Sequence, residues 1–230
     1  MIFRQLFDPV SSTYTYLLAD RRGGEALLID PVVDRVQQYL QLIEELDLKL
    51  VMAMDTHIHA DHVTAIGKLG EATQCATALG EMSSAECASH HYRENEIIKA
   101  GDVKLKAIYT PGHTDDSYSF VMDDRVFTGD TLLIRGTGRT DFQNGDAGAQ
   151  YDSLFNKLLS LPDDTLVYPA HDYEGRTCSS IIEEKDHNPR LQVTSRGEYI
   201  DQMNALELEP PKLIDVAVPA NRSCGLKMAA

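Results

Sequence analysis

The sequence predicts an α/β protein in which two sheets of mixed strand direction pack face to face, with helices outside them. Three observations carry this prediction. Apolar runs of strand length recur along the chain, and some are joined by short turn signals that are typical of hairpins. Two longer segments have the 3.6-residue apolar period of a helix and a third resembles a helix, and these segments are interspersed among the strands rather than alternating strictly with them. Four of the predicted strands end in His or Asp, which places polar side chains along one rim.

The first elements are strands and helices in the N-terminal half. Residues 13–20 (TYTYLLAD) and 25–31 (EALLIDP) are predicted strands, separated by the turn signal RRGG. Residues 34–46 are a predicted helix with one apolar face, formed by Val36, Leu40, Ile43 and Leu46. Residues 49–57 (KLVMAMDTH) are a predicted buried strand that ends in a cluster of His residues. A helix over 61–72 is predicted to begin inside that cluster.

The following elements are mainly strands. Residues 101–114 alternate between apolar and polar positions and break at Pro111-Gly112, which predicts a strand followed by a turn. Residues 117–130 (SYSFVMDDRVFTGD) are a predicted hairpin. Residues 147–161 are a predicted helix with an apolar face of Tyr151, Leu154, Phe155, Leu158 and Leu159. Residues 164–173 (DTLVYPAHDY) are a further short strand.

Length, composition and charge bound the domain organisation and the partners. The 230 residues are 43% hydrophobic and 25% charged, which is ordinary for a chain that buries a full core. We expect one domain, residues 1–230, with a C-terminal extension from about residue 176 whose Pro-rich part, 207–221, runs over the surface. The net charge of −15 argues against a nucleic-acid or anionic-membrane partner, and no apolar run approaches the length of a membrane span.

The cysteines and the N-terminal residues predict a cytoplasmic protein. The four cysteines, Cys75, Cys87, Cys178 and Cys224, are scattered without a CxxC pair, so we expect reduced thiols. The start MIFRQLFDPV has neither the apolar core of a signal peptide nor the Arg and Ser content of a transit peptide. The sequence does not determine the oligomeric state, and it allows a homodimer.

The segment THIHADH, residues 56–62, places three imidazoles and a carboxylate within seven residues. Neutral imidazoles and carboxylates are ligands of first-row divalent metals. His57 and His59 can project together from a strand end, and Asp61 and His62 follow on the turn into the next predicted helix. Because the whole chain has only eight His residues, three of them within six positions favour a metal site over a polar loop.

Three further candidates share one context, a strand end followed by a turn: His113 in TPGHT, Asp130 in FTGDTL and His171 in YPAHDY. Taken singly, each is an ordinary loop residue or, for Asp130, a turn or helix cap. Their shared context predicts that they converge with the His cluster on one rim. His90 and His91 lack this context and are expected on the surface, and no pattern assigns a role to His187.

These motifs, in this order and spacing, resemble the metallo-β-lactamase superfamily, whose fold is an αββα sandwich with a metal site at one edge. The segments LLIRGTGRTDFQNGDA, YPAHDYEGRT, EEKDHNPRL and DVAVPANRSCG further resemble the persulfide (sulfur) dioxygenases, the ethylmalonic-encephalopathy protein type. The resemblance runs from about the fourth residue to Gly225. One departure is Thr137, where many members of that family have Cys.

The resemblance implies one Fe(II) per chain, held by His57, His113 and Asp130. It implies oxidation of glutathione persulfide by O₂ and water to sulfite and glutathione, in hydrogen sulfide catabolism. His59 and His62 would then surround the ligands, holding water and orienting them, and Asp61 and His171 would handle protons. Arg139 would clamp a glutathione carboxylate or brace its own loop through Asp141 or Asp172, and Tyr173 and Arg176 are further substrate-binding candidates.

The alternative is a glyoxalase-II-like dizinc hydrolase of glutathione thioesters. In hydrolytic members of the superfamily the same seven positions hold two metals, and all seven are present here: His57, His59, Asp61, His62, His113, Asp130 and His171. The short tail, which matches the dioxygenases rather than the helical glutathione-binding segment of glyoxalase II, disfavours this alternative. A purely metal-binding or redox-partner module is poorly supported, because no flavin-type partner domain is attached.

Overall fold

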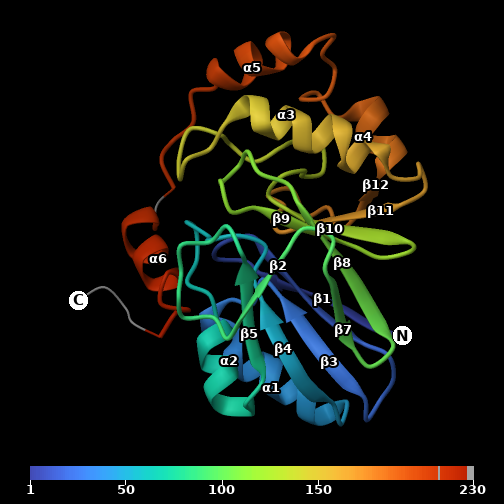
Figure 1. Ribbon diagram of the computed structural model, residues 1–230, viewed down its shortest axis with the longest axis vertical. Helices are drawn as coiled ribbons and strands as arrows, with labels where there is room; N and C mark the ends of the chain where they lie inside the picture. The colour runs from blue at the N-terminus through green and yellow to red at the C-terminus, as the bar shows by residue number, and fades with distance from the viewer. Residues whose placement is uncertain (212, 227–230) are drawn as a thin grey trace. The chain divides into compact units, whose positions relative to one another are not determined.

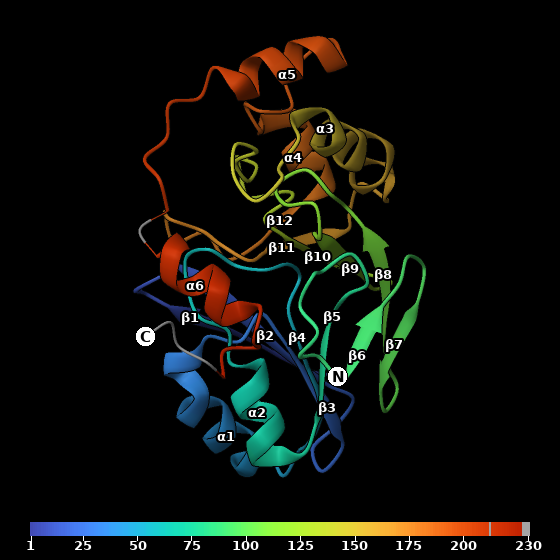
Figure 2. The same ribbon diagram turned by 60° about the vertical axis from the view of Figure 1, so that its left-hand side comes forward.

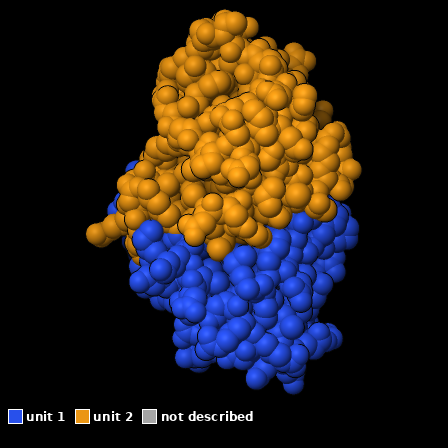
Figure 3. Space-filling view, turned by 90° about the vertical axis from the view of Figure 1, so that its right-hand side faces the viewer, with its two compact units in different colours: residues 1–92, 97–105, 210–230 blue, residues 93–96, 106–209 orange. Residues whose placement is uncertain are grey.

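The structure is a computed structural model that describes residues 1–211 and 213–226. Its strands form two six-stranded sheets, in the orders β1-β2-β3-β4-β5-β6 and β12-β11-β10-β9-β8-β7 (Figure 1). Each sheet contains both parallel and antiparallel pairs, so the predicted class of two mixed sheets with helices is confirmed. The chain divides into two compact units: unit 1 is residues 1–92, 97–105 and 210–230, and unit 2 is residues 93–96 and 106–209 (Figure 3).

The first sheet lies in unit 1. Its strands are β1 (Ile2–Asp8), β2 (Thr13–Ala19), β3 (Glu25–Ile29), β4 (Lys49–Met54), β5 (Ala76–Gly80) and β6 (His90–Tyr92). The pairs from β1 to β3 are antiparallel, and the pairs from β3 to β6 are parallel. The carboxyl ends of β3 and β4 therefore lie at the same edge, where Asp30 and the residues from Asp55 onwards follow them.

The helices of unit 1 are the 3₁₀ turn η1 (Val33–Arg35), α1 (Val36–Glu45), α2 (Ile66–Thr73) and α6 (Ile214–Asn221). α1 and α2 lie side by side on one face of the first sheet (Figure 2). One apolar core joins them to the sheet, with Ile43 of α1, Leu69 of α2 and Leu28 of β3 among its buried members. The predicted helix start at Asp61 is wrong. α2 begins at Ile66, because the preceding residues are held in a loop by buried polar groups.

Unit 2 contains most of the second sheet. Its strands are β8 (Val103–Tyr109), whose first residues belong to unit 1, β9 (Tyr118–Val121), β10 (Arg125–Gly129), β11 (Leu166–Pro169) and β12 (Ser179–Ser180), and β7 (Ile97–Ala100) completes the sheet. β9 and β10 form the predicted hairpin, in which the Met122 N–H donates to the Arg125 carbonyl at 2.8 Å.

The helices of unit 2 are α3 (Ala147–Asn156), the turn η2 (Leu158–Ser160), α4 (Ile181–His187) and α5 (Arg196–Asn204). α5 lies beside α3 (Figure 1). The two helices pack through aromatic rings, since the Tyr199 ring lies 5.7 Å from the Tyr151 ring and 6.3 Å from the Phe155 ring. The predicted helix over 147–161 is thus present, with its last turn as η2.

Two expectations from the sequence are corrected. His90 and His91 are not in a surface loop but in β6, half-buried, and His91 Nε2 lies 2.9 Å from the Ala85 carbonyl oxygen. Cys87 and Cys224 form a disulfide, so the prediction of four reduced thiols is wrong for this pair, while Cys75 and Cys178 are free.

The tail makes a contact that the sequence did not predict. α6 packs against the rest of unit 1 through Ala217, Ala220 and Asn221, which are buried. The sequence missed this contact because the partners of α6 lie about 160 residues earlier in the chain. Within the described residues, no helix has both the length and the apolar character needed to span a membrane.

Candidate metal centre

The metal-ligand candidates of unit 1 lie on residues 55–65, which we call the metal loop. Asp30, which follows β3, accepts hydrogen bonds from the Thr56 backbone N–H (2.6 Å) and hydroxyl (3.1 Å). Asp55 accepts a hydrogen bond from the Thr64 hydroxyl at 2.9 Å. Both carboxylates are 1% exposed, so charge-assisted hydrogen bonds in a buried environment hold the two ends of the loop.

The hydrogen bonds of the three imidazoles on the metal loop indicate which ring nitrogen would coordinate a metal. His57 Nδ1 lies 3.0 Å from the Thr56 hydroxyl, so Nε2 would coordinate. His59 has the opposite orientation, because its Nε2 lies 3.1 Å from Asp30 Oδ1 and its Nδ1 would coordinate. His62 Nδ1 lies 2.9 Å from Asp61 Oδ2, so Nε2 would coordinate. A partner on one ring nitrogen sets the tautomer and the direction of the other.

The charge around His59 favours a cation. Burial by itself lowers the pKa of this imidazole, but the carboxylates of Asp30, Asp61 and Asp55 outweigh it and raise the pKa to about 9. The same carboxylates that stabilise a proton on the ring also stabilise a positive ion beside it. The metal loop therefore has the electrostatic character of a cation site.

The candidates of unit 2 are His113, Asp130 and His171, which lie on three loops at strand ends. His113 follows β8 after Pro111-Gly112. Gly112 has a φ of +138°, and a Cβ at this position would lie 2.3 Å from Gln150 Cα, so only glycine fits. This close approach to α3 sets the path of the backbone into His113.

Asp130 lies between the two imidazoles of unit 2. Its Oδ2 is 3.5 Å from His113 Nε2, and its Oδ1 is 2.7 Å from His171 Nδ1. His113 Nδ1 is 2.7 Å from the Arg139 carbonyl oxygen, so Nδ1 carries the proton and Nε2 would coordinate. Asp130 can thus offer one carboxylate oxygen to a metal while it holds His171 with the other.

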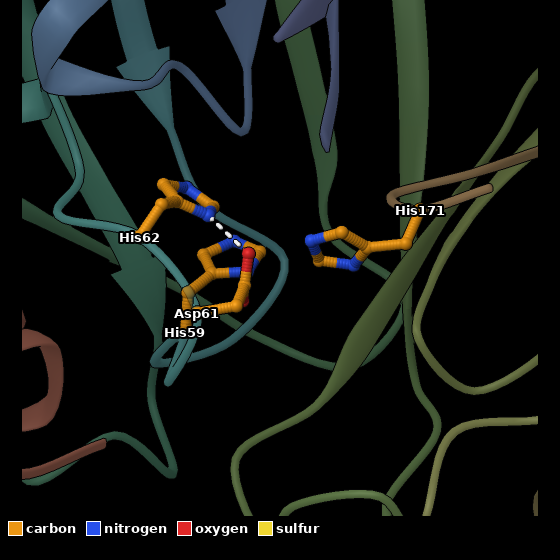
Figure 4. A group of neighbouring side chains, drawn as sticks. All are labelled: His59, Asp61, His62 and His171. Atoms are coloured by element: carbon orange, nitrogen blue, oxygen red, sulfur yellow. Dashed lines mark hydrogen bonds and ion pairs between the residues drawn. The ribbon is translucent and has the colours of Figure 1, made fainter. Parts of the chain in front are cut away.

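The predicted residues form two groups that could each hold a metal ion. One ligand atom from each of His57, His113 and Asp130 lies within 4.8 Å of the others. The same holds for His59, Asp61, His62 and His171, whose side chains point toward one another (Figure 4). The first group combines two imidazole nitrogens with one carboxylate oxygen, a donor set that suits first-row divalent metals. The residues present therefore fit a metal.

Arg139 makes its hydrogen bonds within unit 2. Its Nε and Nη2 each donate to Asp141 at 2.7 Å, and it also donates to the carbonyls of Leu208 (3.2 Å) and Glu209 (2.6 Å). The arginine also holds the pKa of the Asp141 carboxyl below its usual range, mainly through this hydrogen bond. These contacts favour bracing over a substrate clamp, and the bracing partner is Asp141 rather than Asp172.

Tyr173 and Arg176 lie on the loop after His171. The Tyr173 ring is 70% exposed and nearly parallel to the His171 ring, with centroids 6.1 Å apart. Asp172 Oδ2 accepts hydrogen bonds from the backbone N–H of Glu174 (2.9 Å) and of Arg176 (2.7 Å), which gives the loop a turn. The Arg176 guanidinium forms an ion pair with Glu174.

Two residues that orient the metal loop were missed from the sequence. Asp30 contacts both Thr56 and His59, and the sequence carried a signal for it, because it lies at the end of a predicted strand together with Pro31. Asn221 donates to the His59 and His62 carbonyls, at 2.8 and 2.9 Å. No local pattern points to it, since it lies in the tail.

Comparison with known proteins identifies the superfamily and a group of similar enzymes within it. The family model of the metallo-beta-lactamase superfamily matches residues 8–171. The human mitochondrial persulfide dioxygenase ETHE1 is 46% identical over 230 residues, which cover 99% of this chain and 90% of the human protein. The crystal structure of ETHE1 from Myxococcus xanthus has a TM-score of 0.95 and 56% identity, covering 98% of this chain and 100% of that chain.

A hydrolase is also among the similar proteins. The hydroxyacylglutathione hydrolase of Dictyostelium discoideum is 30% identical over 189 residues, which cover 77% of this chain and 69% of that protein. Both its identity and its coverage are lower than those of the human dioxygenase. The residues matched by the family model, 8–171, include all seven predicted metal-site positions.

Proposed function

This chain belongs to the metallo-β-lactamase superfamily and, within it, to the persulfide dioxygenases, and from this membership we propose that it oxidises glutathione persulfide with O₂ and water to sulfite and glutathione at a single ferrous ion. Its fold is the metallo-β-lactamase fold and its enzyme class is oxidoreductase. The observation that carries the choice of metal is the group of His57, His113 and Asp130. Two His and one carboxylate are typical of non-haem Fe(II) oxygenases.

The three ligands are oriented by partners of their own. His57 is turned by the Thr56 hydroxyl and His113 by the Arg139 carbonyl, so that each would present Nε2. Asp130 is held by His171 Nδ1 through the oxygen that is farther from His113. When bound, ferrous iron supplies open coordination positions for the persulfide sulfur and O₂, together with the electrons that O₂ activation requires. The chain's contribution would be two imidazole nitrogens and one carboxylate oxygen, each oriented by a hydrogen-bond partner of its own.

Asp61 and His171 are proposed to handle protons. The Asp61 side chain is 27% exposed and its Oδ1 lies 3.9 Å from His59 Nδ1, so it can exchange a proton between solvent and the site. His171 is 1% exposed, and Asp130 fixes the proton on its Nδ1. Its Nε2 can then accept a proton from water or from the persulfide. His59 and His62 would hold water beside the ligands.

The tripeptide part of the substrate must be recognised in a protein of net charge −15. We propose that Tyr173 and Arg176, on the loop after His171, contact glutathione, with the exposed Tyr173 ring as an apolar surface and Arg176 as the partner of a carboxylate. Arg139 acts indirectly, by holding the loop whose carbonyl group orients His113. Each of these roles can be tested by substitution.

The expectations of a cytoplasmic location and of a homodimer stay predictions. The name of the human relative places that protein in mitochondria. The proposed reaction requires a supply of glutathione persulfide and O₂, wherever the protein is located.

The alternative, a dizinc hydrolase of glutathione thioesters, has one observation in its favour. The second group, His59, Asp61, His62 and His171, could hold a second metal. Against it stands the higher similarity to persulfide dioxygenases over almost the whole chain, compared with 77% of the chain for the hydrolase.

The test is to purify the protein without added metal and to measure metal content and two activities. We expect about one iron per chain, together with O₂ uptake and sulfite formation from glutathione persulfide, and no hydrolysis of S-lactoylglutathione. Zinc ranks above ferrous iron in affinity, so partial zinc occupancy should lower the O₂ uptake in proportion. About two zinc ions per chain with thioester hydrolysis would overturn the proposal.

A further inference from the structure

A disulfide joins two segments of unit 1 that are far apart in the sequence. Cys87 lies in the segment between β5 and β6, and Cys224 lies just after α6, with a sequence separation of 137 residues. The two half-cystines differ in accessibility, since Cys87 is exposed and Cys224 is 1% exposed. Cys87 is therefore the half-cystine at which we expect a thiol in solution to attack.

The segment that contains Cys224 lies directly against the metal loop. The Gly67 N–H donates to the Cys224 carbonyl at 3.0 Å, and a Cβ on Gly225 would lie 2.1 Å from the Thr64 carbonyl oxygen. Ala217 and Ala220 of α6 form an apolar cluster with Val63 of the metal loop. Figure 2 shows α6 beside the chain segment that follows β4.

Asn221 makes the polar contacts between this segment and the metal loop. Its Nδ2 donates to the carbonyls of His59 (2.8 Å) and His62 (2.9 Å), and its Oδ1 accepts from the Thr64 N–H (2.8 Å). The side chain is 1% exposed, so water does not replace these bonds. An amide supplies two donors and an acceptor on a short stem, as these three backbone groups require. A buried backbone group that loses its hydrogen-bond partner is destabilising, so these bonds hold the metal loop in place.

α6 depends on contacts outside the helix to stay folded against the metal loop. α6 has only eight residues and contains Pro219, which cannot donate the backbone hydrogen bond expected of an interior residue. Short helices are marginal without tertiary contacts. The covalent link through Cys224, three residues beyond Asn221, supplies such a contact at the C-terminal end.

We propose that Asn221 is a positioning residue for the metal loop and that the Cys87–Cys224 disulfide is a thiol-reducible tether that keeps it in place. Reduction of the disulfide then loosens the loop and weakens metal binding. The inference rests on the proposed function in one respect, that the metal loop supplies a ligand to the metal. It goes beyond that function, because it makes the metal site sensitive to the thiol-disulfide state of the chain.

The redox step is an ordinary thiol–disulfide exchange. A thiolate attacks Cys87 Sγ, forms a mixed disulfide with it and releases Cys224 as a thiolate. A second thiolate attacks the mixed disulfide, so that two thiols become one disulfide and two electrons pass to the cystine. The reductant is a small thiol such as glutathione, which is also the product of the proposed reaction. The reverse exchange with a glutathione disulfide restores the tether.

The experiment uses Co(II) as the probe, with the full chain loaded with Co(II) in place of its native metal. Release of Co(II) to a chelator is followed for the disulfide form, for protein reduced and then desalted without oxygen, and for Cys87→Ser. The control is Cys178→Ser, which removes an exposed free cysteine. We expect about tenfold faster release from the reduced protein and from Cys87→Ser, as for the loss of a partner that orients metal ligands, and no change in the control.

Asn221→Ala tests whether the tether acts through the amide. This variant should release Co(II) about as fast as the reduced protein, and its reduction should add no further change, because the two perturbations share one path. The visible Co(II) spectrum should shift in the same direction in all three loosened forms, which a loss of stability elsewhere would not produce. If Asn221→Ala does not fold, the comparison of the reduced protein with Cys87→Ser still decides the role of the tether.

Three results would overturn the inference. Equal release rates from the disulfide and dithiol forms exclude the tether. A thiol response that persists in Asn221→Ala excludes Asn221 as the connection. Failure of the wild-type chain to bind Co(II) excludes the metal centre, and with it the proposed function. No persulfide or O₂ is present in these measurements, so a wrong substrate assignment leaves their outcome unchanged.

Discussion

The imidazoles of His57 and His113 differ from that of His59 in the ring nitrogen that forms a hydrogen bond within the protein. His57 and His113 use Nδ1, toward Thr56 and toward the Arg139 carbonyl, whereas His59 uses Nε2 toward Asp30. The first two rings therefore present the same nitrogen, and each stands in a group with Asp130. His59 stands instead with Asp61, His62 and His171. This division at the residue scale is the basis on which we propose that one iron is held by the first group alone.

Substitution of His57 and of His59 tests that division. His57→Ala leaves only His113 and Asp130 as ligands, so it should lose its iron and its O₂ uptake. His59→Ala keeps all three proposed ligands, so it should retain most of its iron and lose activity by about ten- to hundredfold, as for other groups around a metal site. Metal content and O₂ uptake are measured side by side. If both variants lose iron to the same extent, the mononuclear assignment is wrong.

Arg139→Ala tests bracing against direct substrate binding. Because Arg139 holds Asp141 and the Leu208 and Glu209 carbonyls, its loss should reduce the free energy of unfolding by about 1–2 kcal/mol. KM for glutathione persulfide should rise by a smaller factor than the loss of about 1–2 kcal/mol from substrate binding would produce. Arg196→Ala, which breaks an exposed pair with Asp152, is the matched control and should leave the free energy of unfolding nearly unchanged. A large rise in KM with unchanged stability would restore the clamp.

Single residues differ in how far the sequence could identify them. The seven metal-site positions were visible because each lies in a short motif at a strand end, where local spacing carries the signal. The partners of Arg139 could not be read in this way, since two of them are backbone carbonyls 69 and 70 residues away. Asn221 was hidden for the same reason, as its acceptors are also main-chain groups.

At the scale of elements, α4 anchors the loop that follows Asp130. Glu184 is fully buried and accepts hydrogen bonds from the Arg135 backbone N–H (2.9 Å) and from Asn188 Nδ2 (2.8 Å), and it also pairs with the Arg135 guanidinium. Asn188 Nδ2 donates in turn to the Gly136 carbonyl at 2.9 Å. The Gly138 N–H donates to the Asp130 carbonyl at 2.7 Å, so the end of this loop lies beside its start, next to a proposed ligand.

Glu184→Ala should therefore be strongly destabilising. It removes the buried acceptor of the Arg135 backbone N–H and of Asn188 Nδ2, and each buried donor left without an acceptor costs about 1–3 kcal/mol. Glu184→Gln keeps the shape and should lose less. Asp186→Ala, an exposed position on the same helix, should change the free energy of unfolding by about 0.5 kcal/mol at most. Urea unfolding of the three variants gives the values, and similar stability of Glu184→Ala and Asp186→Ala would contradict the anchoring role of α4.

Helices with a clear apolar period and the hairpin with its turn residues could be predicted from the sequence, whereas the short strands β5 and β6 could not. The helices near 34–46 and 147–161 and the hairpin of β9 and β10 follow from apolar period and turn residues. β5 and β6 are short parallel strands whose burial does not alternate, so they lack the signal of a half-exposed strand. The start of α2 was placed too early, because the contacts of Asp55 and Asn221 with Thr64 keep the preceding residues out of the helix.

On the scale of the whole molecule, the proposed iron ligands come from three distant points of the chain, residues 57, 113 and 130. An unfolded chain does not bring them together, so metal binding favours the native state over the unfolded one.

A bound metal ion would also reduce the electrostatic repulsion within the protein. A net charge of −15 opposes compaction, and a divalent cation among buried carboxylates reduces that self-repulsion locally. Metal removal should accordingly lower stability as well as activity.

The prediction is a fall in melting temperature on removal of the metal by a chelator. A ligand at about a hundred times its dissociation constant stabilises the native state by about 2.7 kcal/mol, which corresponds to about 5–10 °C for a chain of this size. Zn(II) added to the metal-free protein should restore the melting temperature, because it binds the same imidazole and carboxylate donors. It should not restore O₂ uptake, because zinc has no redox chemistry, whereas Fe(II) should restore both. Calorimetry and O₂ uptake on the three preparations separate the structural from the chemical role of the ion. Recovery of O₂ uptake with zinc, or an unchanged melting temperature without metal, would contradict a ferrous centre built from these three residues.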